Sequence, residues 1–462
     1  MIRVFKHYVP LPFLVLGIIE NFILVISVYL SFYLRYTNLT YVPGIAAKYL
    51  PEALTFAFGI LAVMFALGLY RREYSRDLRS IFVRLVASFG VGLVALSLIF
   101  YVLPDLKIWR SAFLIAVVLA LAGILAVRIV FLRVCDLAAF KRNILVVGAG
   151  ERAARIEALE NDGPPRGFAA VGYLPVKEEA VSVNPARVVS GVNSLAAFAK
   201  ERGIEEIVVS VEDRRAGLPV ESLLECKLGG IPIVDYSSFW ERETGRVDLD
   251  ALHPSWLIYS DGFGTGRLRS VFKRGFDIVA SLALLIFTLP LIGATALAVA
   301  LEGPGPIFYH QERVGLHGRL FMLLKFRSMK VDAEADGVPR WAAKDDARIT
   351  RTGDFIRKSR IDEIPQIFNV LKGDMSLIGP RPERPHFVAQ LSEIVPYYSE
   401  RHRVKPGITG WAQLNHPYGA TVDAARAKLQ LDLYYVKNYS LFLDLIILMQ
   451  TARVVFWPEG VR

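Results

Sequence analysis

The stretch on which the interpretation of this chain depends is Arg357-Lys358-Ser359-Arg360-Ile361-Asp362-Glu363-Ile364-Pro365-Gln366, followed shortly by Gly379-Pro380-Arg381-Pro382. Pro365 favours the first turn of a helix, and Gly373 predicts where that helix ends. The adjacent carboxylates of Asp362 and Glu363 therefore stand at a predicted helix start. Free N–H groups at such a start attract anions.

Three arginines flank the carboxylate pair: Arg357, Arg360 and Arg381. Guanidinium groups match phosphate oxygens well. A carboxylate nucleophile beside a second carboxylate that could hold a divalent metal suits phosphoryl chemistry. The alternative is structural, because an acidic helix cap balanced by neighbouring arginines has the same residue pattern.

Composition places the chain at a membrane. Its 462 residues suffice for two to four domains of roughly 150 residues, and 53% of them are hydrophobic, which predicts membrane segments. The net charge of +10 suggests anionic partners such as lipid headgroups or nucleotides. We expect no nucleic acid, because zinc-finger spacing and RNA-binding aromatic signatures are lacking. With only Cys135 and Cys226, no disulfide framework is expected, and the soluble parts are predicted to face the cytoplasm.

Four apolar stretches predict a transmembrane helical bundle over residues 1–138, the second being the shortest: Leu11–Leu34, Leu54–Tyr70, Ile81–Val102 and Ala112–Val134. No small-residue cleavage site follows the first stretch, so we expect a retained anchor. Basic residues gather after the second and fourth stretches, which predicts that both ends of the bundle are cytoplasmic. Glu20 and Asn21 fall mid-span, which indicates either a functional site or a hydrogen bond to another helix.

Residues 139–240 alternate strand-like and helical runs, which predicts a parallel, Rossmann-like α/β domain. Its first strand leads into Gly148-Ala149-Gly150, a turn that could cradle a pyrophosphate. No acidic residue ends the second strand, so a structural or regulatory module without a nucleotide is the alternative. Tyr173 and Lys177 imitate the Tyr-x-x-x-Lys pair of short-chain dehydrogenases, although Pro175 disfavours the helix that this pair requires.

Residues 241–267 are predicted to be a linker, and a fifth apolar run, Phe276–Leu301, contains Pro290. Basic residues on both sides of the run favour a helix that breaks at Pro290 and returns to the same side, with Thr288 bonding a freed carbonyl. An ordinary kinked span is the alternative. Ser440–Trp457 is apolar but carries charges, so it suits either a helix on the membrane surface or a buried core helix.

Residues 268–462 carry several motifs in order: Lys325-Phe-Arg-Ser-Met329, Arg357 before Asp362-Glu363-Ile-Pro-Gln366, Gly379-Pro-Arg-Pro382 and Lys405-Pro-Gly-Ile-Thr-Gly-Trp411. With them this portion closely resembles the bacterial polyprenol-phosphate phosphoglycosyl transferases, the monotopic sugar transferase family. The helical bundle and α/β insert resemble the long form of that family. The Gly379–Pro385 version particularly resembles the exopolysaccharide enzymes of PEP-CTERM systems.

The resemblance implies a mostly α catalytic domain with a re-entrant membrane helix at about 276–301, broken at Pro290. It also implies a two-step reaction in which Asp362 attacks a UDP-sugar and passes a hexose 1-phosphate to polyprenyl (undecaprenyl) phosphate, initiating exopolysaccharide or O-antigen synthesis. Glu363 would bind Mg²⁺. Lys325, Arg357 and Arg381 occupy positions that the family associates with phosphate binding and active-site organisation.

The implied location is the bacterial inner membrane, with lipid as a partner and the catalytic domain on the cytoplasmic side. A homodimer is plausible for so apolar a bundle. A competing hypothesis is a membrane-anchored, NAD-dependent nucleotide-sugar epimerase or dehydratase built on the Gly148–Gly150 turn. A transporter built on the N-terminal helices is disfavoured by the small number of spans and of intramembrane polar groups.

Overall fold

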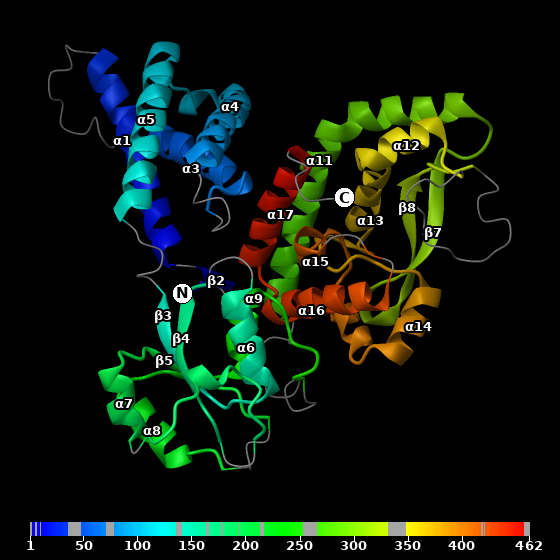
Figure 1. Cartoon of the computed structure of the whole chain (residues 1–462). Helices are drawn as coiled ribbons and strands as arrows, with labels where there is room; N and C mark the ends of the chain where they lie inside the picture. Colours follow the sequence, from blue (N-terminus) through cyan, green and yellow to red (C-terminus); the bar gives the residue numbers. More distant parts are fainter. Residues whose placement is uncertain are drawn as a thin grey trace. The chain divides into compact units, whose positions relative to one another are not determined.

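The computed structural model describes residues 2–4, 7–9, 11–35, 48–70, 78–134, 141–162, 166–176, 179–192, 194–212, 217–252, 266–330, 348–416, 419 and 421–456. The chain divides into two compact units, Met1–Thr244 and Gly245–Arg462. The division falls within the predicted linker. Figure 1 shows the helices and strands of both units.

The first unit begins with a hairpin of β1 (Ile2–Val4) and β2 (His7–Val9), followed by a bundle of apolar helices. The helices are α1 (Leu11–Arg35), α3 (Leu50–Ala66), α4 (Leu78–Val102) and α5 (Arg110–Val134), with the short η1 (Pro104–Leu106) before α5. Three of these helices, α1, α4 and α5, are long and apolar enough to cross a membrane, and α3 is shorter. Their inward faces share one core that contains Leu24, Phe56 and Leu85.

Glu20 lies inside this bundle and is fully buried. Its carboxylate pairs with Arg128 of α5, with Oε1 2.6 Å from Nε and Oε2 3.1 Å from Nη2, and it accepts a hydrogen bond from Tyr70. Arg128 also donates to the Leu69 carbonyl at 3.0 Å. Glu20 thus has the helix-to-helix contact that one of the two alternatives expects. In the described part of the chain, the buried side-chain oxygen of Asn21 has no hydrogen-bond partner.

The rest of the first unit is a four-stranded parallel sheet in the order β4-β3-β5-β6. Figure 1 labels three of its strands, β3, β4 and β5. The predicted parallel strands are confirmed as β3 (Arg142–Val147), β4 (Phe168–Leu174), β5 (Glu206–Val209) and β6 (Ile233–Asp235). Four helices and one short turn connect or follow them: α6 (Glu151–Asn161), η2 (Pro185–Arg187), α7 (Leu195–Glu201), α8 (Val220–Leu228) and α9 (Tyr236–Thr244). β3 and β5 are nearly continuous buried apolar runs, as strands covered on both faces require.

The second unit begins with α11 (Arg267–Glu302), a helix of 36 residues that contains Pro290. Figure 1 shows α11, in green, bent along its length and continuing beyond the bend. It is the fourth helix in the described part of the chain that is long and apolar enough to cross a membrane. The Thr288 hydroxyl donates to Leu284 O at 2.7 Å, because a threonine in a helix reaches back along its own turn. It therefore does not bond the carbonyl that Pro290 leaves free, that of Ile286, and the predicted bond to a freed carbonyl is not formed.

After α11 the chain forms a hairpin of β7 (Phe308–Val314) and β8 (Leu320–Phe326), joined by the short turn η3 (Leu316–Gly318). The remaining elements are α12 (Arg351–Lys358), η4 (Ile361–Glu363), α13 (Gln366–Lys372), β9 (Ser376–Ile378), α14 (Pro385–Ile394), η5 (Tyr398–Arg403), β10 (Gly407–Thr409), α15 (Trp411–Asn415), α16 (Val422–Asn438) and α17 (Leu441–Phe456). β9 and β10 pair in parallel, and β9 is buried along its whole length.

α17 covers most of the apolar stretch predicted at Ser440–Trp457. Leu443, Ile447 and Asp444 are fully buried, and Asp444 Oδ2 lies 2.9 Å from Lys273 Nζ of α11. The first part of this stretch therefore matches the core-helix alternative. Trp457 lies outside the described residues.

Part of the predicted linker is packed into the second unit. Val247, Leu249 and Leu252 are buried in a cluster that also contains Leu391 of α14 and Leu433 of α16. Backbone and side-chain hydrogen bonds add to this docking: Val247 N donates to Gln430 O at 3.0 Å, and Trp411 Nε1 donates to Gly245 O at 2.9 Å. Residues 245–252 therefore belong to the core of this unit.

Leu249→Asp is expected to lower the stability of the second unit by about 3 kcal/mol, because it removes apolar burial and places a carboxylate in the cluster. Thermal unfolding of the purified full chain measures the effect. The control is Ile394→Asp, since Ile394 is 61% exposed on α14. Equal unfolding temperatures for the two variants would show that residues 245–252 do not contribute to the core.

Candidate active site

The stretch around Asp362 forms a short turn followed by a helix. α13 begins directly after Pro365 and ends at Gly373, whose left-handed backbone (φ 102°) closes the helix as predicted. The two carboxylates do not lie in the first turn of α13 but in η4, the short turn before it. η4 starts after Arg360, which is itself left-handed (φ 59°) and redirects the chain as α12 ends.

Neither carboxylate caps a helix. Neither η4 nor α13 has a side-chain hydrogen bond at its N-terminal cap. Asp362 and Glu363 are each only 8% exposed. The acidic-cap alternative does not describe this geometry, since the carboxylates turn into a cationic environment instead.

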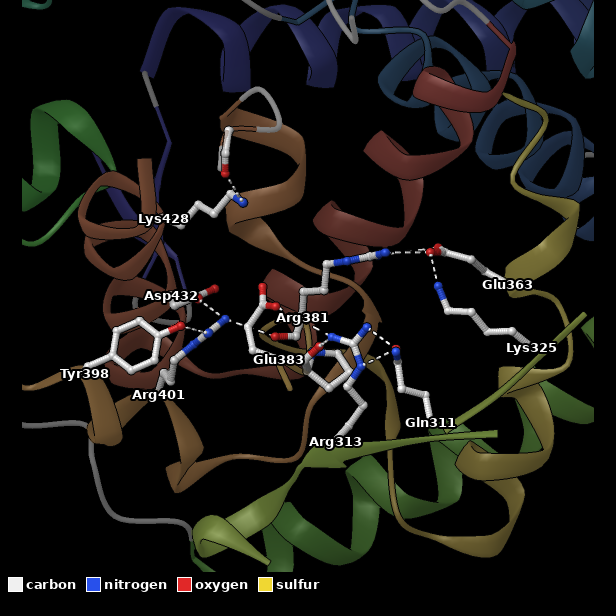
Figure 2. A network of polar contacts seen from close by, with 12 residues as sticks. Gln311, Arg313, Lys325, Glu363, Arg381, Glu383, Tyr398, Arg401, Lys428 and Asp432 are labelled. Atoms are coloured by element: carbon white, nitrogen blue, oxygen red, sulfur yellow. Dashed lines mark hydrogen bonds and ion pairs between the residues drawn. The ribbon is translucent and has the colours of Figure 1, made fainter. Parts of the chain in front are cut away.

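Two cations converge on Glu363 (Figure 2). Lys325 Nζ of β8 lies 3.0 Å from Glu363 Oε1, and Arg381 Nη2 lies 2.6 Å from the same oxygen. Burial alone would raise the pKa of Glu363, but the charges of Arg381 and Lys325 outweigh it and hold this pKa well below its usual range. Glu363 is therefore a fixed carboxylate anion.

The pKa of Asp362 is shifted in the opposite direction from that of Glu363. Burial raises the pKa of Asp362 above its usual value, while the charge of Lys325 opposes that rise and Glu363 adds to it. In the described residues no hydrogen bond reaches its carboxylate. An ionised carboxylate without donors is a better nucleophile than one whose lone pairs are occupied, so the pair divides into one anchored and one available group.

The flanking arginines contribute unequally. Arg357, on α12, lowers the pKa of Asp362 by its charge, although that effect is smaller than those of Lys325, Glu363 and Arg381. Arg360 Nη1 lies 3.9 Å from Glu363 Oε1, with its side chain half exposed. The structure thus brings Lys325 and Arg381 into contact with Glu363 and keeps both of them, together with Arg357, within electrostatic range of Asp362.

Lys325 is positioned by a link between β8 and α13. The side-chain oxygen of Asn369 accepts from Leu324 N at 2.9 Å, and its nitrogen donates to Met322 O at 2.8 Å. These bonds tie the strand beside Lys325 to the helix that follows Glu363. The sequence analysis did not single out Asn369, because its partners are backbone groups 45 and 47 residues away.

Arg381 is positioned by two closely packed backbone segments. A Cβ on Gly379 would lie 2.2 Å from Lys405 O, and one on Gly407 would lie 2.1 Å from Gly379 N. Only glycine permits such an approach, so the Gly379-Pro-Arg-Pro and Lys405-Pro-Gly motifs are two halves of one structure. Together they direct the Arg381 side chain toward Glu363.

The buried ion pair of Arg401 and Asp432 holds the Arg381 backbone in place (Figure 2). Arg401 Nη2 donates to Arg381 O at 3.0 Å and lies 2.7 Å from Asp432 Oδ2, while Arg401 Nη1 donates to the Tyr398 hydroxyl at 2.7 Å. On the other side, Arg313 donates to Pro382 O at 2.9 Å. Asp432 was not predicted from the sequence, because it stands within Leu431–Val436, a part of α16 that is buried throughout, and its partner Arg401 is far from it in the chain.

Asp432→Asn is expected to lower turnover about tenfold, since Arg401 loses its buried counter-ion and no longer fixes the Arg381 carbonyl. The measurement is a double-mutant cycle of initial rates with Arg381→Ala. In the Arg381→Ala background the same substitution should cost little further activity. An equal fold loss in both backgrounds would show that Asp432 acts on general stability and not through Arg381.

Mg²⁺ is the metal ion that the sequence resemblance implies for this site. In the part of the chain that the structure describes, no group of three or more metal-ligating side chains could hold an ion. Mg²⁺ commonly uses only one or two carboxylates and completes its shell with water and substrate phosphates. Glu363, held ionised beside Lys325 and Arg381, would be the carboxylate ligand of such an ion.

The nucleotide-sugar epimerase hypothesis gains no support from this geometry. Tyr173 lies in β4, so it cannot form a helical Tyr-x-x-x-Lys pair, and its hydroxyl is buried. Lys177 lies outside the described residues. The chemistry-bearing cluster is in the second unit.

The described residues combine apolar helices long enough to cross a membrane with a buried carboxylate pair beside cations, features expected of a membrane-associated protein that binds anions. The family model described as "Bacterial sugar transferase" matches residues 268–458. The UDP-glucose:undecaprenyl-phosphate glucose-1-phosphate transferase of Caulobacter vibrioides is 40% identical over 52% of this chain and 96% of its own length. The chain belongs to the bacterial sugar transferase family.

Other relatives are longer than the region that matches. The UDP-N-acetylgalactosamine-undecaprenyl-phosphate N-acetylgalactosaminephosphotransferase of Aeromonas hydrophila is 45% identical over 54% of this chain and 58% of its own length. The UDP-glucose:undecaprenyl-phosphate glucose-1-phosphate transferase of Xanthomonas campestris is 44% identical over 38% of this chain and 37% of its own length. The chain thus matches about a third to about three fifths of the length of these two relatives.

Proposed function

We propose that this protein transfers a sugar 1-phosphate from a UDP-sugar to polyprenyl phosphate and thereby initiates exopolysaccharide or O-antigen synthesis. The observation that carries the proposal is the division of Asp362 and Glu363 into an available and an anchored carboxylate. Membership of the bacterial sugar transferase family supports it. The names of relatives include both glucose and N-acetylgalactosamine donors, so the donor is a UDP-hexose or a UDP-N-acetylhexosamine.

In the first step a carboxylate oxygen of Asp362 attacks the sugar-bearing phosphorus of the donor. A bond forms between this oxygen and phosphorus, and the bond from phosphorus to the bridging oxygen breaks, which releases UMP. The product is an acyl phosphate that links the sugar phosphate to Asp362. Because phosphoryl transfer gathers negative charge on oxygen, the nearby Arg357, Lys325 and Arg381 stabilise the transition state.

Glu363 has a different task. Its depressed pKa keeps it ionised, so it can orient Lys325 and Arg381 and offer oxygens to a divalent cation. A bound Mg²⁺ would supply charge that offsets the repulsion between an anionic nucleophile and an anionic donor. Neighbouring residues in a helical turn point in directions that differ by roughly 100° to 120°, which lets the two carboxylates serve different partners.

In the second step a phosphate oxygen of polyprenyl phosphate attacks the same phosphorus and the bond to Asp362 breaks. The product is a polyprenyl diphosphosugar, and Asp362 returns to its carboxylate form. Each step exchanges one phosphorus–oxygen bond for another, so no oxidant or other co-reactant is needed. The burial of Asp362 limits access of water, which would otherwise hydrolyse the acyl phosphate.

The geometry of α11 supports a re-entrant helix, and we propose that both of its ends lie on the cytoplasmic side of the inner membrane. At its start Lys273 pairs with Asp444 of α17, and at its end Glu302 accepts from Thr352 N at 2.8 Å. Both ends are thus built into the same compact unit. Between them Ile286 and Phe287 are more than 70% exposed, as an apolar segment embedded in lipid requires. Pro290 removes a backbone hydrogen bond next to this segment and favours the bend.

The parallel sheet of the first unit supports a Rossmann-like assignment for this module. The strand order β4-β3-β5-β6 places β3 at the centre, and the glycine turn follows it directly. Such a position is the one at which open parallel sheets bind ligands. The proposed transferase reaction assigns no task to this turn.

The experiment that tests the function measures UMP release from a panel of UDP-sugars by the purified full chain with undecaprenyl phosphate and Mg²⁺. The expected result is release with one donor or a few, dependent on the lipid phosphate for multiple turnovers. Transfer of labelled sugar phosphate to the lipid identifies the product. Failure of every donor in the panel, with folded protein, would contradict the proposal.

A further inference from the structure

The turn Gly148-Ala149-Gly150 between β3 and α6 has the backbone geometry of a phosphate-binding turn. Gly148 is in the left-handed region (φ +117°), and a Cβ there would lie 2.5 Å from Ser210 Oγ. Ala153, in the third position of the Gly-x-Gly-x-x-Ala pattern, is fully buried against the sheet. In dinucleotide-binding folds this arrangement leaves room and free N–H groups for a pyrophosphate at the start of the helix.

A side chain of the same module occupies that space. Ala149 N donates a hydrogen bond to Glu179 Oε2 at 2.8 Å. A Cβ on Gly150 would lie 2.6 Å from Glu179 Oε1 and 3.1 Å from Glu179 Cδ. In phosphate-binding turns the second glycine lets the pyrophosphate approach the backbone; here Gly150 lets a carboxylate approach it.

A second contact fixes the same segment on the turn. Ser182 N donates to Ala149 O at 2.7 Å, so both backbone groups of Ala149 bond to a short stretch that follows β4. The backbone contact of Ser182 therefore holds the segment that carries Glu179 next to the turn. An intramolecular anion of this kind competes with a dissolved ligand at a high effective concentration.

We propose that Glu179 is a built-in substitute for a phosphate-bearing ligand and closes this turn to pyrophosphate-class anions. The carboxylate supplies negative charge at the positive end of the α6 dipole, which is what a phosphate would supply. The match is incomplete, because the buried Oε1 has no hydrogen-bond partner in the described residues. A pyrophosphate has more oxygens with which to accept hydrogen bonds at this turn. Removing the Glu179 side chain should therefore open an anion-binding site there.

The proposal is tested by hydrogen–deuterium exchange of the full chain with and without inorganic pyrophosphate. Exchange is followed locally in peptides that cover the turn, because pyrophosphate also has cationic targets near Asp362. In the wild-type protein pyrophosphate should leave exchange at the turn unchanged. In Glu179→Ala the turn should exchange faster without pyrophosphate, and pyrophosphate should slow it at least severalfold.

Further variants separate occupancy from loss of charge. Glu179→Gln keeps the size of the side chain, so its turn should remain closed to pyrophosphate. Glu201→Ala removes an exposed carboxylate of the same module, at the end of α7, and should behave like the wild type. Glu179→Ser is a second small replacement that guards against a folding defect peculiar to alanine.

Three results would overturn the proposal. The first is protection of the wild-type turn by pyrophosphate as strong as in Glu179→Ala. The second is that pyrophosphate fails to slow exchange at the turn in both Glu179→Ala and Glu179→Ser, while β3 and β5 exchange as in the wild type. The third is faster exchange throughout β3 and β5 in both small variants without pyrophosphate, which would show that Glu179 stabilises the sheet.

Discussion

Asp362→Asn should abolish multiple-turnover UMP release, with a loss on the order of 10³-fold or more. The asparagine amide is nearly isosteric but cannot form the acyl phosphate with the sugar-bearing phosphorus. The fold should be retained, because no hydrogen bond within the described residues depends on the Asp362 carboxylate. Initial rates of UMP release, together with mass spectrometry of the peptide that contains Asp362 after incubation with donor alone, provide the measurement.

The matched control is Asp354→Asn on α12. Asp354 is exposed and pairs with the exposed Lys358 in the same helix, at 2.6 Å, so its loss should change the rate less than about twofold. The mass increment of a sugar phosphate should be found on the wild-type peptide and not on the Asp362→Asn peptide. Substantial turnover by the purified Asp362→Asn protein would refute the assignment of Asp362 as the nucleophile.

Glu363→Gln should reduce both activity and stability. Turnover is expected to fall by a factor on the order of 10² or more, because Lys325 and Arg381 lose the anion that orients them. The free energy of unfolding should drop by about 3 kcal/mol, since two largely buried cations are left without their carboxylate. Rates are measured over a series of Mg²⁺ concentrations, and thermal unfolding is measured without substrate.

The dependence of this stability loss on pH provides a further check. The pKa of Glu363 is lower in the folded than in the unfolded state. Its stabilising contribution is therefore complete above the unfolded pKa of about 4.3 and is lost as pH falls through the folded pKa. The gap in unfolding temperature between wild type and Glu363→Gln should be constant near neutral pH and shrink in acid.

The control for Glu363→Gln is Glu393→Gln, an exposed carboxylate on α14. It should change neither the rates nor the unfolding temperature. A wild-type unfolding temperature in Glu363→Gln would show that the cluster with Lys325 and Arg381 does not stabilise the fold. A wild-type rate at every Mg²⁺ concentration would remove Glu363 from the reaction.

Local signals in the sequence predicted much of the fold. Long apolar runs predicted the helices of the first unit, because burial or lipid is the only favourable environment for such runs and a helix satisfies its own backbone. Pro365 and Gly373 predicted the limits of α13. Proline has a fixed φ that suits a helix start, and glycine can adopt the left-handed conformation that ends a helix. The parallel strands followed from apolar runs separated by helical segments.

Other features depended on contacts between residues far apart in the chain. The sequence placed residues 241–267 in a linker because they are polar and rich in glycine, yet Leu249 packs against α16. Such docking depends on a complementary groove that a local pattern does not reveal. The hydroxyl of Thr288 likewise bonds a different carbonyl from the predicted one, because the choice among neighbouring carbonyls depends on the local helix geometry.

The sequence by itself identified the candidate residues of the site: the carboxylates of Asp362 and Glu363 and the cations Lys325, Arg357 and Arg381. Those types and spacings are local, and their motifs are specific. Only the tertiary structure decided how the two carboxylates differ, because burial and the positions of Lys325 and Arg381 set their opposite pKa shifts. Only the tertiary structure, likewise, placed Glu179 on the Gly148–Gly150 turn, since the contact joins residues 30 positions apart through the packing of the sheet.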